Sequence, residues 1–434
     1  MDKIGSLIFS QHKNELDLLA RLAAAESLPI YLVGGCLRDH LLKRDSADYD
    51  FVCAVDPSRI AQAFAKQINA HWFYLDQQRG YSRVVMRNAT KLQFDFAPFR
   101  GPSLEIDLAL RDFTINAMAL PLTIPLDTSA LIDPLNGQGD LAAQRLRMCG
   151  DSVIAADPLR ILKGIRHCAK LNLAVDNVTQ QQFIAHAPLL KQVAGERIRS
   201  ELSQLFAAIN SEAALRMLVE CDVAAALTLS CTSAQIVECH RTIEHRIYQL
   251  KQQLQEDCKR QLNLLCGDGF TVSGLAVFIA IMRCCAVSGD SLDGLLKWLH
   301  FEKRIAQLLR FFLNTSAAQF DKYRRLDCSE RGKLLWLQHH HAPLPQALIF
   351  CQLLSSGAID TQQLLALQHL WQQSQTNGRM QPLLPAEYIQ QLVPHCKGQQ
   401  LGQCLKAIEL AEINGIVANI DDGELYLDKW CESN

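Results

Sequence analysis

Short apolar runs separated by turn residues dominate the N-terminal part of the chain. These runs lie at residues 31–33, 49–52, 71–75, 82–86 and 92–97. Each run has the length and the content of β-branched or aromatic residues that are typical of a strand. The segments before and between them place apolar residues three or four positions apart, as amphipathic helices do. The pattern therefore predicts a small sheet with helices packed against it.

The second half of the chain has a different pattern, which repeats every 3.6 residues in almost every segment after Phe206. Clear examples are residues 213–218, 275–282, 292–298, 305–312 and 364–371. Polar breaks separate these segments, and no longer repeat of fixed period is present. We predict the fold class α+β, in which a small mixed sheet is followed by an all-helical half.

Candidate chemistry is concentrated between residues 31 and 52. Gly34 and Gly35 follow the first predicted strand and precede a helical pattern that contains Arg38, and Gly-Gly lets backbone N–H groups approach phosphate oxygens. Asp48 and Asp50 lie two positions apart on the next predicted strand, so their carboxylates project from one face. Like charges this close favour a bound cation, and Mg²⁺ prefers a few carboxylates together with substrate phosphates. The stretch indicates phosphoryl transfer, although an isolated Asp-x-Asp can also be a solvated turn.

Several further stretches extend this picture in sequence order. They are GGCLRD with DYD, LRDFTINAMAL (110–120), IDPLNGQGDL (132–141), ADPLRILKGIRHCAKL (156–171) and GERIRSEL (195–202). Together they resemble the motifs of the tRNA nucleotidyltransferase and bacterial poly(A) polymerase family, the class II CCA-adding enzymes. The resemblance implies a nucleotidyltransferase head at 1–140 and a helical neck with a base-reading helix at 141–206. It also implies an RNA-binding helical body at 207–335 and a helical tail at 336–434.

The resemblance implies a role for one more acid, Asp95, which stands between Phe94 and Phe96. A charged residue flanked by apolar ones is costly unless it points into a polar site. The nucleotidyltransferase fold uses a third carboxylate on a neighbouring strand, and Asp95 fits that position as a metal ligand or a base. A structural salt bridge is the alternative.

The RDFT stretch carries the next candidate. In the resembling family the second arginine of an Arg-Arg-Asp motif holds the phosphates of the incoming nucleotide, and Arg111 takes that position. Leu110 replaces the first arginine. We expect residues 112–120 to be helical, which places Asn116 one turn after Asp112 on the same face.

The following stretch predicts a helix with Asp157 as its N-cap and Pro158 as its first residue. Its register places Arg160, Lys163 and Arg166 on one face. A carboxylate and a guanidinium side by side suit the exocyclic amine and ring nitrogen of cytosine or adenine.

In the family, a Glu-Asp-x-x-Arg motif reads the base as a protein template. Asp157 and Arg160 match its essential pair, and Ala156 replaces the glutamate. In isolation the pattern would be a plain helix cap with a basic solvent-facing side.

The resemblance implies a template-independent enzyme that adds cytidines (CC, or the full CCA) to the tRNA 3′ end from CTP and ATP. An A-adding enzyme or a poly(A) polymerase is the alternative. Only residues 101–106 join Arg100 to Asp107, where full CCA-adding members have a flexible segment. The CC-adding branch is marked by a short connection here, so we expect CC addition, with a separate enzyme adding the adenosine.

Charge and cysteine content change the picture little. The net charge is −2, although residues 241–335 carry more Lys and Arg than Asp and Glu, which permits a basic face for tRNA. The 16 cysteines include no C-x-x-C pair, which favours reduced thiols. No apolar run reaches the ~18 residues of a membrane span. We expect a cytoplasmic protein that does not bind a membrane.

Overall fold

A computed structural model describes the chain in nine stretches. They are residues 12–87, 92–208, 212–254, 262–315, 329–339, 346–354, 359–376, 379–394 and 397–433. The chain forms two compact units, Met1–Leu190 with Cys221–Val223, and Lys191–Glu220 with Ala224–Asn434. The finer division into head, neck, body and tail stays a prediction.

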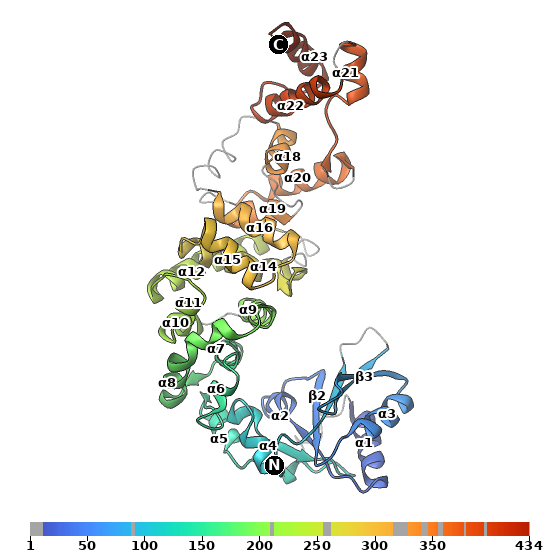
Figure 1. Cartoon of the computed structure of the whole chain (residues 1–434), viewed down its shortest axis with the longest axis vertical. Helices are drawn as coiled ribbons and strands as arrows, with labels where there is room; N and C mark the ends of the chain where they lie inside the picture. Colours follow the sequence, from blue (N-terminus) through green and yellow to red (C-terminus); the bar gives the residue numbers. More distant parts are fainter. Residues whose placement is uncertain are drawn as a thin grey trace. The chain divides into compact units, whose positions relative to one another are not determined.

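The first unit contains a sheet (Figure 1). It has six strands in the order β3-β4-β5-β2-β1-β6. Its strands are β1 (Ile30–Val33), β2 (Asp48–Cys53), β3 (Ala70–Asp76), β4 (Tyr81–Met86), β5 (Gln93–Pro98) and β6 (Ala119–Pro121). Strands β2 and β5 are parallel and every other pair is antiparallel, so the sheet is mixed. The predicted α+β class is confirmed, and each of the five predicted strands is present to within two residues at either end.

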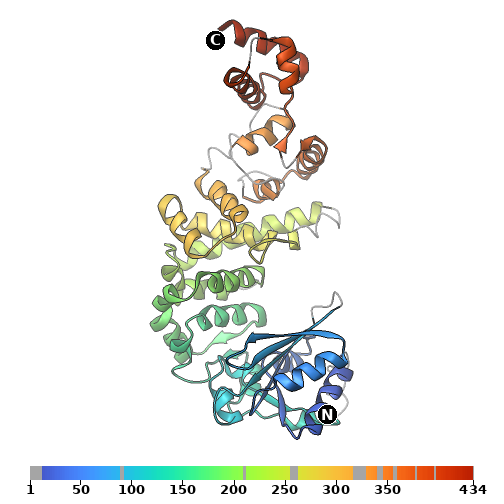
Figure 2. The same ribbon diagram turned by 45° about the vertical axis from the view of Figure 1, so that its right-hand side comes forward.

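One face of this sheet is covered by helices α1 (Lys13–Ala25) and α3 (Ser58–Gln67) (Figure 2). Phe51 and Phe94 point into that layer and are fully buried. Because side chains alternate along a strand, the residues on either side of Phe51 and Phe94 face the opposite way. The helices therefore leave the other face of β2 and β5 for polar side chains.

The prediction of a helix at residues 112–120 is wrong. The chain there forms a short 3₁₀ helix, η2 (Thr114–Asn116), and then strand β6, which pairs with β1 through Leu32 opposite Leu120. Residues 117–120 are a continuous apolar run and are all buried. A short run of this kind suits a buried strand or a buried helix equally well, so only the pairing partner decides between them.

The remaining elements of the first unit are short helices and one strand pair. They are α2 (Gly35–Leu41), α4 (Leu104–Ala109), η3 (Thr128–Ala130), α5 (Gly137–Ala142), α6 (Val153–Ala156), α7 (Arg160–Leu171), α8 (Asn177–His186), η4 (Ala187–Gln192, whose last two residues belong to the second unit), β7 (Arg145–Leu146) and β8 (Ala174–Val175). Helix α7 begins at Arg160, not at Pro158 as predicted. A tight turn precedes it, in which the Arg160 N–H donates to the Asp157 carbonyl at 3.0 Å.

After residue 190 the described chain is helical except for two short strand pairs, which confirms the predicted all-helical half. The helices are α9 (Gly195–Ala208), α10 (Glu212–Glu220), α11 (Val223–Ala226), α12 (Ser233–Gln253), α14 (Val272–Cys284), α15 (Gly289–Trp298), α16 (Lys303–Asn314), α18 (Glu330–His339), α19 (Gln346–Leu354), α20 (Thr361–Ser374), α21 (Ala386–Leu392), α22 (Gln399–Ile413) and α23 (Ile420–Ser433). The pairs are β9 (Leu265–Gly267) with β10 (Phe270–Thr271), and β11 (Gln375–Thr376) with β12 (Arg379–Met380). Among the described residues, no helix combines the length and the apolar content needed to cross a membrane.

Candidate active site

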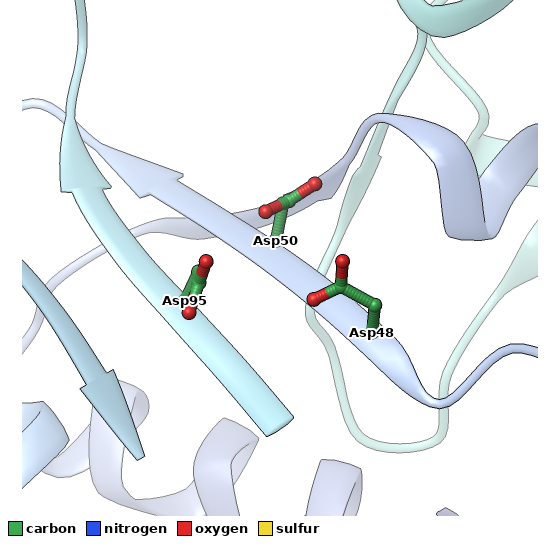
Figure 3. A group of neighbouring side chains, drawn as sticks. All are labelled: Asp48, Asp50 and Asp95. Carbon is green, nitrogen blue, oxygen red and sulfur yellow. The ribbon is translucent and has the colours of Figure 1, made fainter. Parts of the chain in front are cut away.

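Three carboxylates meet on the sheet face that lies opposite α1 and α3. Asp48 and Asp50 project from β2, and Asp95 projects from the neighbouring strand β5 (Figure 3). The parallel register places Asp50 directly opposite Asp95. One carboxylate oxygen from each of the three residues lies within 4.8 Å of the others. The structure therefore brings together the three acids that the sequence predicted.

The pKa values of two of these acids are raised. Burial, with the charges of Asp48 and Asp95 next, raises the pKa of Asp50 to about 7. Burial also raises the pKa of Asp48, although the amide of Gln93 donates to its Oδ1 at 3.0 Å and opposes the shift. Oxygen ligands held this close to one another are suited to a divalent metal ion.

Gly34 directly follows β1 and allows the backbone to pass close to the three carboxylates. Its backbone has a φ of 82°, in the region that favours glycine, and a Cβ there would lie 2.8 Å from Oδ2 of Asp50. A Cβ on Gly35 would lie 3.3 Å from Nη2 of Arg38. The predicted glycine pair thus lets the backbone pass close to both a carboxylate and a guanidinium.

Arg38 is buried in α2 and makes hydrogen bonds to protein groups. Its Nε and Nη2 donate to Oδ1 of Asp39 at 2.9 and 2.8 Å, and its Nη1 donates to Oδ1 of Asn116 at 2.7 Å. The amide of Asn116 in turn donates to Asp112 at 3.1 Å. Asp112 and Asn116, which we expected on the same face of a helix, are thus in contact, although a 3₁₀ turn brings them together instead of an α-helix.

Arg111 is oriented by a buried acid. Its Nε and Nη2 donate to Oδ2 of Asp107 at 3.0 and 2.9 Å, and Asp107 is fully buried. Oδ1 of Asp107 accepts the Arg100 N–H at 3.0 Å. All three residues line a cleft of about 220 Å³ together with Asp50 and Asp95. The structure thus places the predicted phosphate-binding arginine beside the carboxylates.

The predicted base-reading helix has the two faces that its periodicity indicates. Arg160, Lys163 and Arg166 are half-buried, whereas Ile161 and Ile165 are fully buried. The guanidinium of Arg160 donates to carbonyls of the preceding motifs. Its partners are the carbonyls of Leu110 and Val153, each at 3.2 Å.

Burial lowers the pKa of Arg160, and the nearby carboxylates of Asp112 and Asp157 oppose that shift. Arg160 thus ties α7 to the RDFT segment and lies near Asp157, its predicted partner.

Two charged residues of this site were missed by the sequence analysis. Arg83 on β4 donates from Nε and Nη2 to the two oxygens of Asp95, both at 2.7 Å, so the salt bridge considered for Asp95 exists within the carboxylate group. Nothing in the sequence pairs Arg83 with Asp95, because strand pairing is not visible there. Asp107 is four residues before Arg111, a helical spacing that could have identified the pair.

Comparison with known proteins agrees with the geometry. Residues 30–147 match the family described as poly A polymerase head domain, and residues 172–230 match the probable RNA and SrmB-binding site of polymerase A. The N-terminal part of this chain is therefore similar to the tRNA nucleotidyltransferase and poly(A) polymerase family. The family resemblance that the motifs indicated is thereby confirmed.

Relatives within the family carry different nucleotide specificities. The CC-adding tRNA nucleotidyltransferase of Geobacter sulfurreducens is 43% identical over 188 residues, which cover 43% of each chain. The A-adding tRNA nucleotidyltransferase of Deinococcus radiodurans is 41% identical over 179 residues, which cover 40% of this chain and 39% of that protein. The matched region thus spans about two fifths of the length of these relatives.

Solved structures match over almost the whole chain. A CCA-adding enzyme in complex with ATP has a TM-score of 0.70 at 18% identity and covers 98% of this chain and 96% of its own. The Thermotoga maritima CCA-adding enzyme complexed with tRNA has a TM-score of 0.65 at 19% identity, with coverages of 97% and 95%. At this identity the likeness shows a shared fold.

Proposed function

We propose that this protein is a template-independent tRNA nucleotidyltransferase that adds cytidines to the tRNA 3′ end from CTP. The observation that carries the proposal is the row of three carboxylates beside the cleft lined by Arg111. In the reaction, the terminal hydroxyl oxygen bonds to the α-phosphorus. The bond to the bridging oxygen breaks, pyrophosphate leaves, and the hydroxyl proton is lost.

The carboxylate group fits Mg²⁺, because its donors are oxygens, and burial together with like charges already raises the pKa of Asp50. Asp48 and Asp50 would hold the metal, and Asp95 would be a third ligand or the base for the hydroxyl proton. When bound, Mg²⁺ would neutralise the charge that develops on the transferred phosphoryl group.

Other side chains of the first unit would bind and orient the triphosphate. Arg111 is held by Asp107 with its Nη1 toward Gly34, where it would bind phosphate oxygens together with the backbone of Gly34 and Gly35. Arg38, fixed by Asp39 and Asn116, would add a positive charge next to them. Guanidinium groups that are already fixed lose little freedom when phosphate binds.

Base selection would fall to α7. Asp157 and Arg160 would contact the Watson–Crick edge of cytosine, and Lys163 and Arg166 would extend the same basic face toward the nucleotide. The half-buried face of α7 supports this role.

The short connection between β5 and α4 supports CC addition. Helix α4 begins at Leu104, so part of the six-residue link is itself helical. The Ser103 hydroxyl accepts the N–H of Ile106 at 3.4 Å, and the Arg100 N–H is bound by buried Asp107. A link anchored at both ends has little freedom to reshape the cleft for ATP.

One assay tests the proposal. The full-length protein is incubated with Mg²⁺, CTP and ATP and a tRNA that ends at its discriminator base, and the 3′ ends are sequenced. We expect product ending in CC. The matched reaction uses tRNA ending in CC with ATP alone, and here we expect no extension.

Each other outcome of this assay identifies a specific alternative. Product ending in CCA would show a full CCA-adding enzyme, and adenylation of the CC-ending tRNA alone would show an A-adding enzyme. Long adenosine tails would show a poly(A) polymerase. CC addition would imply a separate A-adding enzyme as a functional partner. A cytoplasmic location stays a prediction from the sequence.

A further inference from the structure

Arg83 lies in line with two of the site carboxylates across three neighbouring strands. On β4 it stands directly opposite Asp95 of β5, and Asp95 stands directly opposite Asp50 of β2. Side chains opposite one another on one face of a sheet lie within contact distance. The strand register therefore places the guanidinium of Arg83 next to Asp95, on the side away from Asp50.

The contact between Arg83 and Asp95 is bidentate. Nε donates to Oδ1 and Nη2 donates to Oδ2, both at 2.7 Å. The side chains are 29% and 21% exposed, so water competes only partly for the pair. Two parallel charge-assisted hydrogen bonds fix the plane of a carboxylate as well as its position. Asp95 is thus held in one orientation, with an oxygen within 4.8 Å of those of Asp48 and Asp50.

The charge of Arg83 also acts on the rest of the group. Its pKa is raised, first by the hydrogen bonds to Asp95 and also by the charges of Asp48 and Asp50. The charge of Arg83 opposes the rise in the pKa of Asp48. Arg83 is thus one of the cations of the chain that act on the three acids, and it is paired directly with Asp95.

We propose that Arg83 is a positioning residue that presents Asp95 as a ligand to the divalent cation. The inference rests on the proposed function only in taking the three carboxylates as a cation site. Residues that hydrogen-bond to metal ligands typically change metal affinity by about 10–100-fold when they are replaced. Arg83 would act in this way, through Asp95 and without contact to nucleotide or tRNA.

The direct test is cation binding by the full-length, nucleotide-free protein, followed with Mn²⁺ by electron paramagnetic resonance. We expect R83Q to weaken Mn²⁺ binding by about 10–100-fold and R83K to weaken it less, because an ammonium keeps the charge but cannot form both bonds. R79Q is the matched control. Arg79 lies in the turn between β3 and β4. Its Nε is 3.6 Å from Oδ2 of Asp76, and its side chain is 74% exposed. This variant should bind Mn²⁺ as the unchanged protein does.

A double-mutant cycle separates positioning from direct contact. If Arg83 acts only through Asp95, then D95N and the double variant R83Q/D95N bind Mn²⁺ equally. The same cycle in the transfer assay should show that R83Q raises the Mg²⁺ concentration needed for half-maximal rate, while the rate at saturating Mg²⁺ is largely restored.

Several results would overturn the inference. They are unchanged Mn²⁺ binding in R83Q, a further loss when R83Q is added to D95N, and no Mn²⁺ binding by the unchanged protein. Thermal unfolding is measured for each variant. If R83Q does not fold, the comparison of Mn²⁺ binding by R83K with Mn²⁺ binding by R79Q tests the inference. If the unchanged protein binds Mn²⁺ and R83Q does not, but no tRNA is extended, the proposed function fails and the positioning role stands.

Discussion

Two charged groups of the first unit are assembled by different geometry. Asp48, Asp50 and Asp95 come from adjacent strands, and their oxygens approach within 4.8 Å. The basic residues of α7 come from successive turns of one helix, where neighbouring positions are about 5–6 Å apart at Cβ. Strand pairing thus concentrates charge, whereas the helix spreads it along a face.

The difference has consequences for the chemistry. Burial and the neighbouring acids raise the pKa of Asp50 to about 7, and the three acids are the proposed cation site, so we expect each acid to be essential to the reaction. The basic face of α7 is half-buried, and Arg160 is already bound to backbone carbonyls. Changes on that helix should alter which nucleotide is chosen more than whether transfer occurs.

The largest expected effect is that of Asp50→Asn. We expect cytidine addition to fall by roughly a thousandfold or more, because loss of a metal ligand removes several kcal/mol of transition-state stabilisation. The melting temperature should not fall, since the substitution removes a buried charge that faces two like charges. Rates of cytidine addition are measured with CTP and tRNA lacking CCA. The melting temperature is measured by circular dichroism.

Asp48→Ala should behave in the same way, whereas Asp76→Asn is the matched control. Asp76 lies at the end of β3 in an exposed ion pair with Arg79. Retention of more than about a tenth of the rate in the Asp50 or Asp48 variant would contradict the metal-ligand assignment.

An intermediate effect is expected for Gly34→Ala. The added Cβ would lie 2.8 Å from Oδ2 of Asp50, in backbone with a φ of 82°. We expect a loss of stability of about 1–3 kcal/mol and a rate reduced by roughly ten- to a hundredfold, because either the carboxylate or the backbone must move. Chemical denaturation measures the stability, and the same transfer assay measures the rate.

Gly294→Ala in α15 controls for the substitution itself. Nothing lies within 4 Å of a Cβ at Gly294, so stability should rise by about 0.5–1 kcal/mol without a change in rate. A fully active Gly34→Ala variant would show that the close approach to Asp50 is not needed.

The smallest effect is expected for Arg160→Ala. The preference for CTP over UTP should relax by roughly tenfold, within the range of about 1–3 kcal/mol for a lost base contact. Single-nucleotide incorporation from each of the four triphosphates measures the preference. Lys170→Ala, at an exposed position near the end of α7, should leave it unchanged. An equal loss of rate with all four triphosphates would instead make Arg160 a brace between α7 and the RDFT segment.

The sequence by itself determined the class of the fold and the identity of the acids. Alternation along strands places Asp48 and Asp50 on one face, and helical periodicity separates Arg160, Lys163 and Arg166 from the buried Ile161 and Ile165. These are local properties, because the repeat of a strand or a helix depends only on neighbouring residues. For the same reason the five longer strands and the helices α10, α14, α15, α16 and α20 were predictable.

Only the tertiary structure decided the contacts between distant segments. The bidentate pairing of Arg83 with Asp95 and the alignment of Asp95 with Asp50 depend on the order and register of β4, β5 and β2. The identity of residues 119–121 as strand β6 depends on pairing with β1, since the same apolar run also suits a helix. Register depends on which strands pair and on the turns that join them, so the pattern of one strand does not determine its partner.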